Sequence, residues 1–244
     1  MRLDAHAIYE TNYFSSLVYG LAKYEADNIG AVCKTDVLSK TSKTLAIREV
    51  LSNKFGVGNS VFRTGIQGDQ EVETVPFGCW KREVFEKYGY YDVRLVRNQD
   101  IELNKRIIHG GGKIVIIPDT YSTYLARETY SKLAKNNFGN GKWNILTVFY
   151  TGELRSLSVR HFVPLGFVIG LLLPLFLGFF WRPTIILFLA VLLLYLLSLG
   201  TVSAKLALSK KLNFIYLLVS FIVLHISYGC GSLIALMNLP FMKK

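Results

Sequence analysis

Hydrophobic and polar residues are distributed unevenly along this 244-residue chain. Short apolar runs alternate with polar ones over residues 1–160, which also hold all 17 acidic residues. Residues 161–244 contain no acid and consist mainly of three long apolar runs, at about 162–180, 184–203 and 214–237. Each approaches the roughly 20 residues that a helix needs to cross a bilayer. The pattern predicts a water-soluble part followed by a membrane part with three transmembrane helices.

Within the soluble part, apolar residues at helical spacing predict helices over residues 13–25, 45–51, 81–88 and 101–109. Short apolar runs predict strands over 28–35 and 113–117, the second of which Pro118 should end. Residues 53–74 are rich in glycine and polar side chains, which predicts a long loop. Strands alternating with helices indicate an α/β domain.

Residues 130–160 combine polar and aromatic side chains, a composition typical of an amphipathic segment that lies on the membrane surface. Basic residues on both sides of the apolar runs then set the orientation. Arg155, Arg160 and the lysines of 205–211 predict that the soluble part faces the cytoplasm of a multi-pass protein in the cell membrane. The final pair, Lys243 and Lys244, conflicts with this topology, because three spans would place it outside.

The formal net charge of +11 divides into five charges on residues 1–160 and six on residues 161–244. A charge spread in this way does not indicate a nucleic-acid partner; it suits phosphate-rich donors and anionic lipid headgroups. The three cysteines are far apart and lack metal-binding spacing, which argues against a disulfide framework or a zinc site.

An acidic pair, Asp100 and Glu102, begins the helix predicted over 101–109. Neighbouring carboxylates in a cleft can divide the work of catalysis, one as general base and the other as its support. The same pattern also fits a purely structural role, with Asp100 as a helix cap and Glu102 as a first-turn acid favoured by the helix dipole.

Two further groups of residues have side chains suited to a phosphate-sugar substrate. Asp4 and His6 point the same way on an extended segment and could hold one divalent ion, Mg²⁺ or Mn²⁺, beside a diphosphate. Their spacing alone favours the alternative, an irregular N-terminal segment without a metal. Lys142 and Trp143, in the run F-G-N-G-K-W, could contact a sugar and its phosphates, or anchor the segment at the membrane surface.

Several motifs, in the same order, are shared with one known family. These are R-L-D-A-H-A at 2–7, F-G-V-G-N-S-V-F-R at 55–63, V-P-F-G-C-W-K-R-E-V-F at 75–85, N-Q-D-I-E-L-N-K-R-I at 98–107, N-F-G-N-G-K-W at 137–143 and H-I-S-Y-G-C-G at 225–231. With them the chain resembles the membrane-bound family 2 inverting glycosyltransferases, in particular the succinoglycan-type exopolysaccharide glucosyltransferases. It departs from the family pattern at Gln99, which replaces Glu, and at Lys142, which replaces Arg.

The resemblance implies a partial GT-A fold (a nucleotide-diphospho-sugar transferase domain) lacking its first βαβ half. We therefore expect the C-terminal part of a catalytic domain over 1–130, an interfacial segment over 131–160 and three transmembrane helices over 161–244. A separate N-terminal half is an expected partner, because the family's nucleotide-binding half would precede Arg2.

The resemblance also implies an inverting mechanism. Asp4 and His6 would bind the metal beside the donor, a nucleotide-sugar of the UDP-sugar kind, and Asp100 would deprotonate the acceptor hydroxyl. Glu102, Lys142 and Trp143 would support a polyprenyl-diphosphate-linked or glycan acceptor at the lipid bilayer. The alternative from another class is a catalytically inactive fragment or membrane partner subunit; a transporter fits poorly, because His225 is the one ionisable residue inside the spans.

Overall fold

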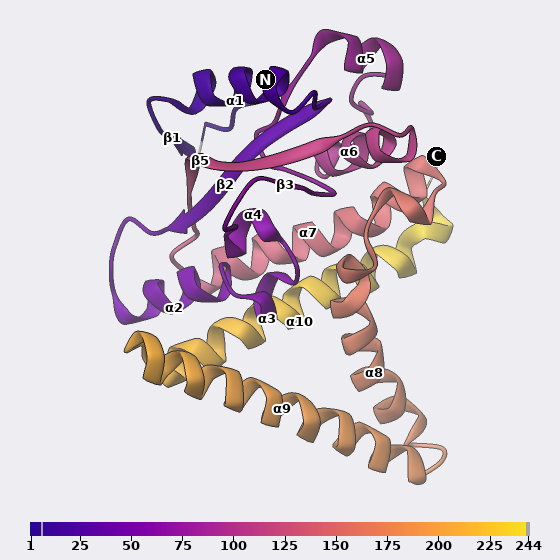
Figure 1. Cartoon of the computed structure of the whole chain (residues 1–244). Helices are drawn as coiled ribbons and strands as arrows, with labels where there is room; N and C mark the ends of the chain where they lie inside the picture. The colour runs from indigo at the N-terminus through magenta and orange to yellow at the C-terminus, as the bar shows by residue number, and fades with distance from the viewer. Residues whose placement is uncertain (6, 243–244) are drawn as a thin grey trace. The chain divides into compact units, whose positions relative to one another are not determined.

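The computed structural model describes residues 1–5 and 7–242, and its helices and strands are labelled in Figure 1. The described chain forms two compact units, and each is assembled from separate stretches of sequence. The first unit comprises residues 1–38, 51–126 and 147–157, and the second comprises residues 39–50, 127–146 and 158–244. The sequence boundaries predicted at 130 and 160 stay predictions.

The first unit contains a mixed five-stranded sheet, which confirms the predicted α/β class. Its strands are β1 (Ala7–Tyr9), β2 (Asn28–Asp36), β3 (Gln70–Glu71), β4 (Cys79–Trp80) and β5 (Ile114–Leu125). Their order is β1-β5-β2-β4, and β3 also pairs with β5. β2 and β5 run parallel, and the other three pairings are antiparallel. The assignment of this sheet to a partial GT-A fold stays a prediction.

Strand β5 does not end at Pro118, so the predicted stop at this residue is wrong. The strand continues to Leu125 as a neighbour of both β2 and β1. Its ladder with β2 shifts register between Ala31 and Val32, which leaves Pro118 to Thr120 outside the pairing. A proline has no N–H to donate, and a bulge is one of the few places inside a sheet that tolerates this.

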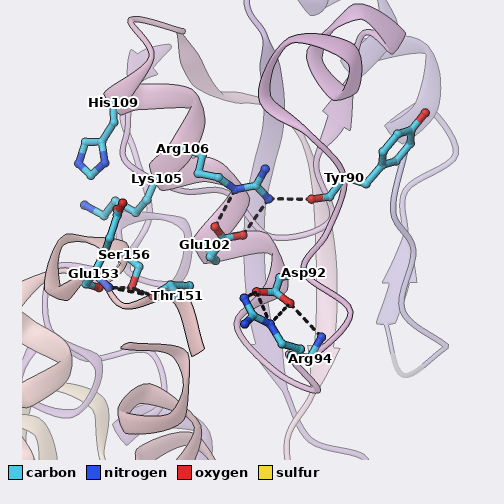
Figure 2. Close-up of a pocket in the computed structure, with 10 residues that line it drawn as sticks. All are labelled: Tyr90, Asp92, Arg94, Glu102, Lys105, Arg106, His109, Thr151, Glu153 and Ser156. Atoms are coloured by element: carbon cyan, nitrogen blue, oxygen red, sulfur yellow. Dashed lines mark hydrogen bonds and ion pairs between the residues drawn. The ribbon is translucent and has the colours of Figure 1, made fainter. Parts of the chain in front are cut away.

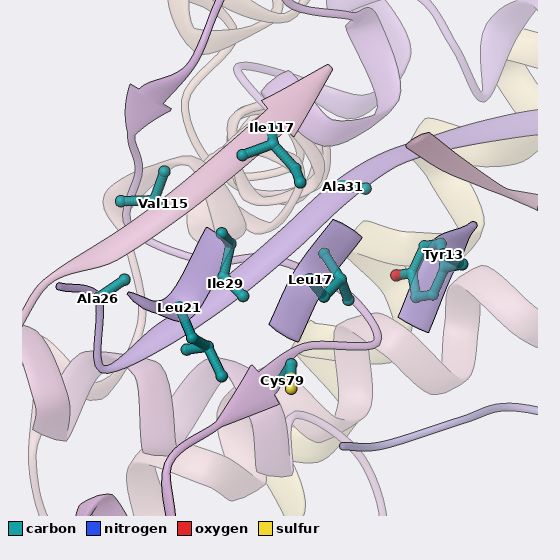
Figure 3. Close-up of a cluster of buried hydrophobic side chains, with 9 residues drawn as sticks. All are labelled: Tyr13, Leu17, Leu21, Ala26, Ile29, Ala31, Cys79, Val115 and Ile117. Carbon is teal, nitrogen blue, oxygen red and sulfur yellow. The ribbon is translucent and has the colours of Figure 1, made fainter. Parts of the chain in front are cut away.

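Helices cover both faces of this sheet. Side chains that alternate along a strand point to opposite faces. Val115 and Ile117 accordingly pack with α1 (Tyr13–Lys23), in the buried cluster of Figure 3. Ile114 and Ile116 pack with side chains of α5 (Arg82–Tyr88) and α6 (Gln99–His109). The predicted helices over 13–25, 81–88 and 101–109 are thus confirmed, with ends shifted by one or two residues.

The stretch predicted as a long loop is more structured than its composition indicates. It contains two single-turn helices, α3 (Lys54–Val57) and α4 (Val61–Thr64), and then strand β3. Gly58 and Gly65 end these helices with φ angles of 62° and 92°, a conformation that side-chain-bearing residues rarely adopt. Glycine here ends helical turns, and it does not mark a continuous loop as its frequency in this stretch predicts.

The second unit is almost entirely helical. It contains α2 (Ser42–Val50), most of α7 (Tyr130–Thr151), α8 (Val163–Leu177), α9 (Pro183–Lys210) and α10 (Phe214–Asn238). Short 3-10 turns lie at Leu154–Ser156, Val159–Phe162 and Leu239–Phe241, the first of them in the first unit. Three segments are long and apolar enough to cross a membrane: Val159–Leu177, Pro183–Lys210 and Phe214–Phe241.

Candidate functional site

Helix α6 carries Asp100 and is fixed to the sheet by a buried polar network. The amide of Asn104, on the inner face of α6, is fully buried. Its Oδ1 accepts a hydrogen bond from Asn28 of β2 at 2.7 Å, and its Nδ2 donates to Thr74 at 2.9 Å. Because buried amides are costly to leave unpaired, this network determines how α6 lies on the sheet.

The first turn of α6 follows a residue in the left-handed conformation. Asn98 has a φ of 64°, which asparagine tolerates better than most residues, and its side chain makes no capping bond. It donates instead to the hydroxyl of Thr147 at 3.2 Å. Asp100, offered above as a possible cap, lies inside the first turn and accepts the backbone N–H of Ile101 at 3.0 Å.

The Asp100 carboxylate lies beside a cation and an aromatic ring. The Arg2 guanidinium is 3.8 Å from its Oδ1, and the same guanidinium lies 5.7 Å from the centre of the Tyr91 ring. Burial raises the pKa of the Tyr91 hydroxyl, and the nearby Arg2 partly opposes that rise. The Asp100 side chain keeps 27% of its surface exposed, so it remains accessible to a substrate.

Glu102 points away from Asp100, because residues two apart on a helix do not face each other. Its carboxylate is buried at 7% exposure and binds Arg106 through two contacts, of 2.6 and 2.8 Å. Arg106 also donates to the backbone carbonyls of Tyr88 and Tyr90. The structure therefore does not bring the two predicted carboxylates together. Glu102 binds Arg106 of the same helix, and Arg106 connects α6 to the end of α5 and to Tyr90.

A polar cavity of about 340 Å³ lies on the Glu102 side of α6 (Figure 2). Asp100 is not among the residues that line it, which are Tyr90, Asp92, Arg94, Glu102, Lys105, Arg106, His109, Thr151, Glu153 and Ser156. Several of its charges are paired, as in Arg94 with Asp92 at 2.7 Å and Lys105 with Glu73 at 3.1 Å. Hydrogen bonds from Arg94 lower the pKa of Asp92. Carboxylates, guanidinium groups and hydroxyls are groups that can bind the hydroxyls of a sugar.

The predicted metal ligands are only partly described by the structure. Asp4 is exposed, and its backbone N–H donates to the Tyr9 hydroxyl at 2.8 Å. His6 lies outside the described residues. Among the residues described, no group of three or more His, Cys, Asp or Glu side chains is placed to hold a metal ion. The metal site stays a prediction.

Lys142 and Trp143 lie on the part of α7 that belongs to the second unit, whereas Asp100 belongs to the first. Their role beside Asp100 therefore stays a prediction. Lys142 is exposed, and the glycine before it packs against α10. Ser232 of α10 donates to the carbonyl of Gly141 at 3.0 Å. The runs F-G-N-G-K-W and H-I-S-Y-G-C-G, far apart in sequence, thus lie against each other.

Sequence reasoning assigned no role to three residues that the structure places near candidate groups. Arg2 and Tyr91 lie close to Asp100; Arg2 is part of the R-L-D-A-H-A motif, but nothing in the local pattern singled out Tyr91. Arg63 donates to Thr35 at 3.3 Å and lies 5.2 Å from the Tyr124 ring, at the carboxyl ends of β2 and β5. Ligands of α/β proteins commonly bind at such strand ends, so the position of Arg63 is predictable once the two strands are paired.

The chain was compared with models of protein families and with curated proteins. No model of a known protein family matches the chain. It is 30% identical over 142 residues to the succinoglycan biosynthesis protein ExoA of Rhizobium meliloti (strain 1021). The match covers 58% of this chain and 42% of that protein, so the chain spans less than half the length of the relative. This likeness supports the general class inferred from the motifs, a family 2-like glycosyltransferase.

Proposed function

We propose that the chain acts as a membrane-associated glycosyltransferase in exopolysaccharide synthesis. It would move a sugar from a nucleotide-diphosphate donor, of the UDP-sugar kind, to a lipid-linked or polysaccharide acceptor with inversion. The likeness to a succinoglycan biosynthesis protein supports the class of reaction and the polymer. Three helices apolar enough to cross a membrane support a location at the cell membrane.

The observation that carries the proposal is the position of Asp100. A general base needs a carboxylate that a substrate can reach and that the fold holds still. Asp100 meets both requirements: part of its side chain is exposed, and α6 is fixed to the sheet through buried Asn104. The Arg2 guanidinium lies 3.8 Å from its Oδ1. Asp100 is therefore our candidate for the group that takes the proton from the acceptor hydroxyl.

Glu102 is more suited to supporting the helix than to proton transfer, because both of its oxygens bind Arg106. A divalent cation would neutralise charge on the departing diphosphate. The exposed carboxylate of Asp4 fits the oxygen donors that such a cation prefers, and an imidazole at position 6 would favour Mn²⁺ over Mg²⁺. Lys142 and Trp143 remain our candidates for contacts to the acceptor and its phosphates.

Transfer of a labelled sugar in membranes tests the role of Asp100. We expect Asp100→Asn to lower transfer by about 10²–10⁴-fold, the usual contribution of a general base. Asp119→Asn, a change of an equally small acid on the exposed bulge of β5, is the matched control and should keep full transfer. Thermal unfolding of both variants must match the natural chain, so that lost transfer reflects chemistry. Equal transfer by Asp100→Asn and the natural chain would instead favour a membrane partner subunit without catalysis.

A further inference from the structure

The third apolar helix differs from the other two in how much of it the protein covers. In the most apolar window of each candidate span, 39% of residues are buried for Phe214–Phe241, compared with 11% for Val159–Leu177 and 6% for Pro183–Lys210. Helices α8, α2 and α9 pack against α10, and α7 contacts it through its backbone. Since α8 and α9 are themselves candidate spans, α2 and α7 are the neighbours that bear on whether α10 can cross. The helices that cover α10 therefore decide where it can lie in a membrane.

Helix α7 contacts α10 near the start of both helices and again farther along each of them. Near the start of both helices, the Tyr130 hydroxyl donates to the carbonyl of Tyr216 at 3.3 Å. Farther along, a Cβ at Gly231 would overlap the carbonyl oxygen of Phe138, and Ser232 donates to Gly141. Contacts that advance together along both sequences mean that the two helices run in the same direction. The depth of α10 in a membrane therefore also determines the depth of α7.

Helix α7 cannot cross a bilayer, because the chain on both of its sides belongs to the same soluble unit. Residues 51–126 before it belong to the first unit, and so do residues 147–157, which comprise its last turn and the chain that follows. The intervening 127–146 would extend about 30 Å as a helix, the thickness of the hydrocarbon core. A crossing would place those two parts of one compact unit on opposite sides of the membrane.

The free face of α7 is also unsuited to hydrocarbon. Lys132, Lys135 and Lys142 are all exposed there. Lys142 follows Gly141, which lies against the backbone of Tyr228 near the middle of α10, so a spanning α10 would hold this lysine near the bilayer centre. A lysine at that depth costs about 2.5–3.5 kcal/mol even on the mildest scales.

A second polar helix, α2, also packs on α10. It is bounded on both sides by residues of the first unit, so it too cannot enter the membrane. Its Glu49, with a side chain only 5% exposed, binds Lys210 at the end of α9 at 2.7 Å. The end of α9 is thereby fixed at the level of α2, outside the hydrocarbon.

Most of the residues of α10 that remain exposed are apolar. Ile215, Ile222, Ile234 and Met237 are exposed, at 60%, 38%, 46% and 66%. A helix with polar helices on one side and an apolar strip on the other is built to lie in the plane of the membrane surface. We propose that α10 lies in the interface of the cytoplasmic leaflet, with its apolar strip among the acyl chains, and that α8 and α9 alone cross as a hairpin.

The charges of the chain agree with this topology and remove the conflict found in the sequence. A hairpin of two spans returns the chain to the cytoplasm, and α10 and the basic pair at 243–244 then stay there. Arg155, Arg160 and the three lysines of 205–211 are on the cytoplasmic side as well. Among the lysines and arginines that flank the spans, only Arg182 is on the opposite side of the membrane. Three spans would leave Lys243 and Lys244 outside, against the positive-inside rule.

Side-specific labelling of single cysteines in native membranes tests the topology. Asn238→Cys reports the end of α10, with Lys211→Cys as the cytoplasmic reference and Arg182→Cys as the reference for the far side; all three positions are exposed. Cys230→Ala removes the one natural cysteine that is not buried. We expect an impermeant maleimide to label 238 and 211 from the same side. Labelling of 238 from the side that labels 182 would overturn the proposal.

Depth measurement by spin labels in vesicles gives an independent test that does not depend on glycosyl transfer. Labels at Ile215, Ile222 and Ile234 should all lie at one shallow depth, about 5–10 Å below the headgroups. A label at Leu193, exposed in the middle of α9, is the reference for the bilayer centre. A spanning α10 would instead separate the labels at 215 and 234 by roughly 28 Å along the membrane normal, and that profile would refute the interfacial placement.

Discussion

Replacing Gly231 by alanine should destabilise the second unit, because α7 and α10 touch at this point through their backbones. The added Cβ would overlap the carbonyl oxygen of Phe138 and lie 2.8 Å and 2.9 Å from its carbonyl and α carbons. Carbon atoms normally approach to about 3.5–4.0 Å, so the two helices must separate by roughly 1 Å. Backbone atoms have no rotamer to change, so neither helix can relieve the contact locally.

Overpacking of this kind costs about 1–3 kcal/mol. For a chain of this size each kcal/mol lowers the midpoint of thermal unfolding by about 2–4 °C, so we expect a loss of about 2–12 °C. The midpoint can be followed in mild detergent through the fluorescence of Trp143, which lies on α7 itself. Gly141→Ala should behave alike, since its Cβ would overlap the carbonyl oxygen of Tyr228.

The matched control is Gly170→Ala in α8, where an added Cβ meets no atom within 4 Å. Alanine is the better helix former by about 1 kcal/mol, so this change should leave the midpoint unchanged or raise it. If Gly231→Ala unfolds at the same temperature as Gly170→Ala, the direct backbone contact between α7 and α10 is refuted. The proposed interfacial placement of α10 would then be refuted as well, because it depends on this contact with α7.

Three further predictions concern buried or paired polar groups. Asn104→Leu leaves the Asn28 amide without its partner and should cost about 1–3 kcal/mol of unfolding free energy, measured by denaturant titration. Lys210→Gln leaves the buried carboxylate of Glu49 without its cation and should lower the thermal midpoint by a similar free energy, with exposed Lys211→Gln as the unchanged control. Because Arg94 lowers the pKa of Asp92 in the folded state, that carboxylate stabilises the fold above its unfolded pKa and loses this effect as pH falls through the folded pKa. The midpoint difference between the natural chain and Asp92→Asn should therefore shrink as pH falls from about 5 to about 3.

The elements with a clear apolar period were predictable from the sequence, and those that depend on a distant partner were not. Helix α1 follows from Leu17 and Leu21 at helical spacing, and β2 follows from its apolar run. The continuation of β5 beyond Pro118 depends on a bulge opposite Ala31 and Val32, which no local pattern announces. A proline is a reliable stop only where the partner strand stays in register.

The candidate site was predictable in part. The position of Asp100 at the start of a helix was predictable and is confirmed. The predicted placement of Asp100 and Glu102 in one cleft is wrong, because the two acids have different partners. Residues two apart on a helix point about 200° apart, so the predicted helix already implied different neighbours for the two acids. What the sequence could not supply was the identity of those neighbours, Arg2 for one and Arg106 for the other.

Apolar length alone predicts a third span, and the structure confirms a third helix of sufficient length, whereas our proposal places this helix in the interface. Hydropathy counts the residues of a helix and ignores the helices that cover it, here α2 and α7. If α7 lies at headgroup level, Lys142 lies there too, in the layer where the phosphates of a lipid-linked acceptor would be held. Gly141 and Gly231 allow α7 and α10 to pack closely. These glycines would then affect the proposed reaction indirectly, because the packing determines the depth of Lys142 in the membrane. Variants at Gly141 and Lys142 should accordingly differ: the first should lower stability, and the second should weaken use of the acceptor while stability stays unchanged.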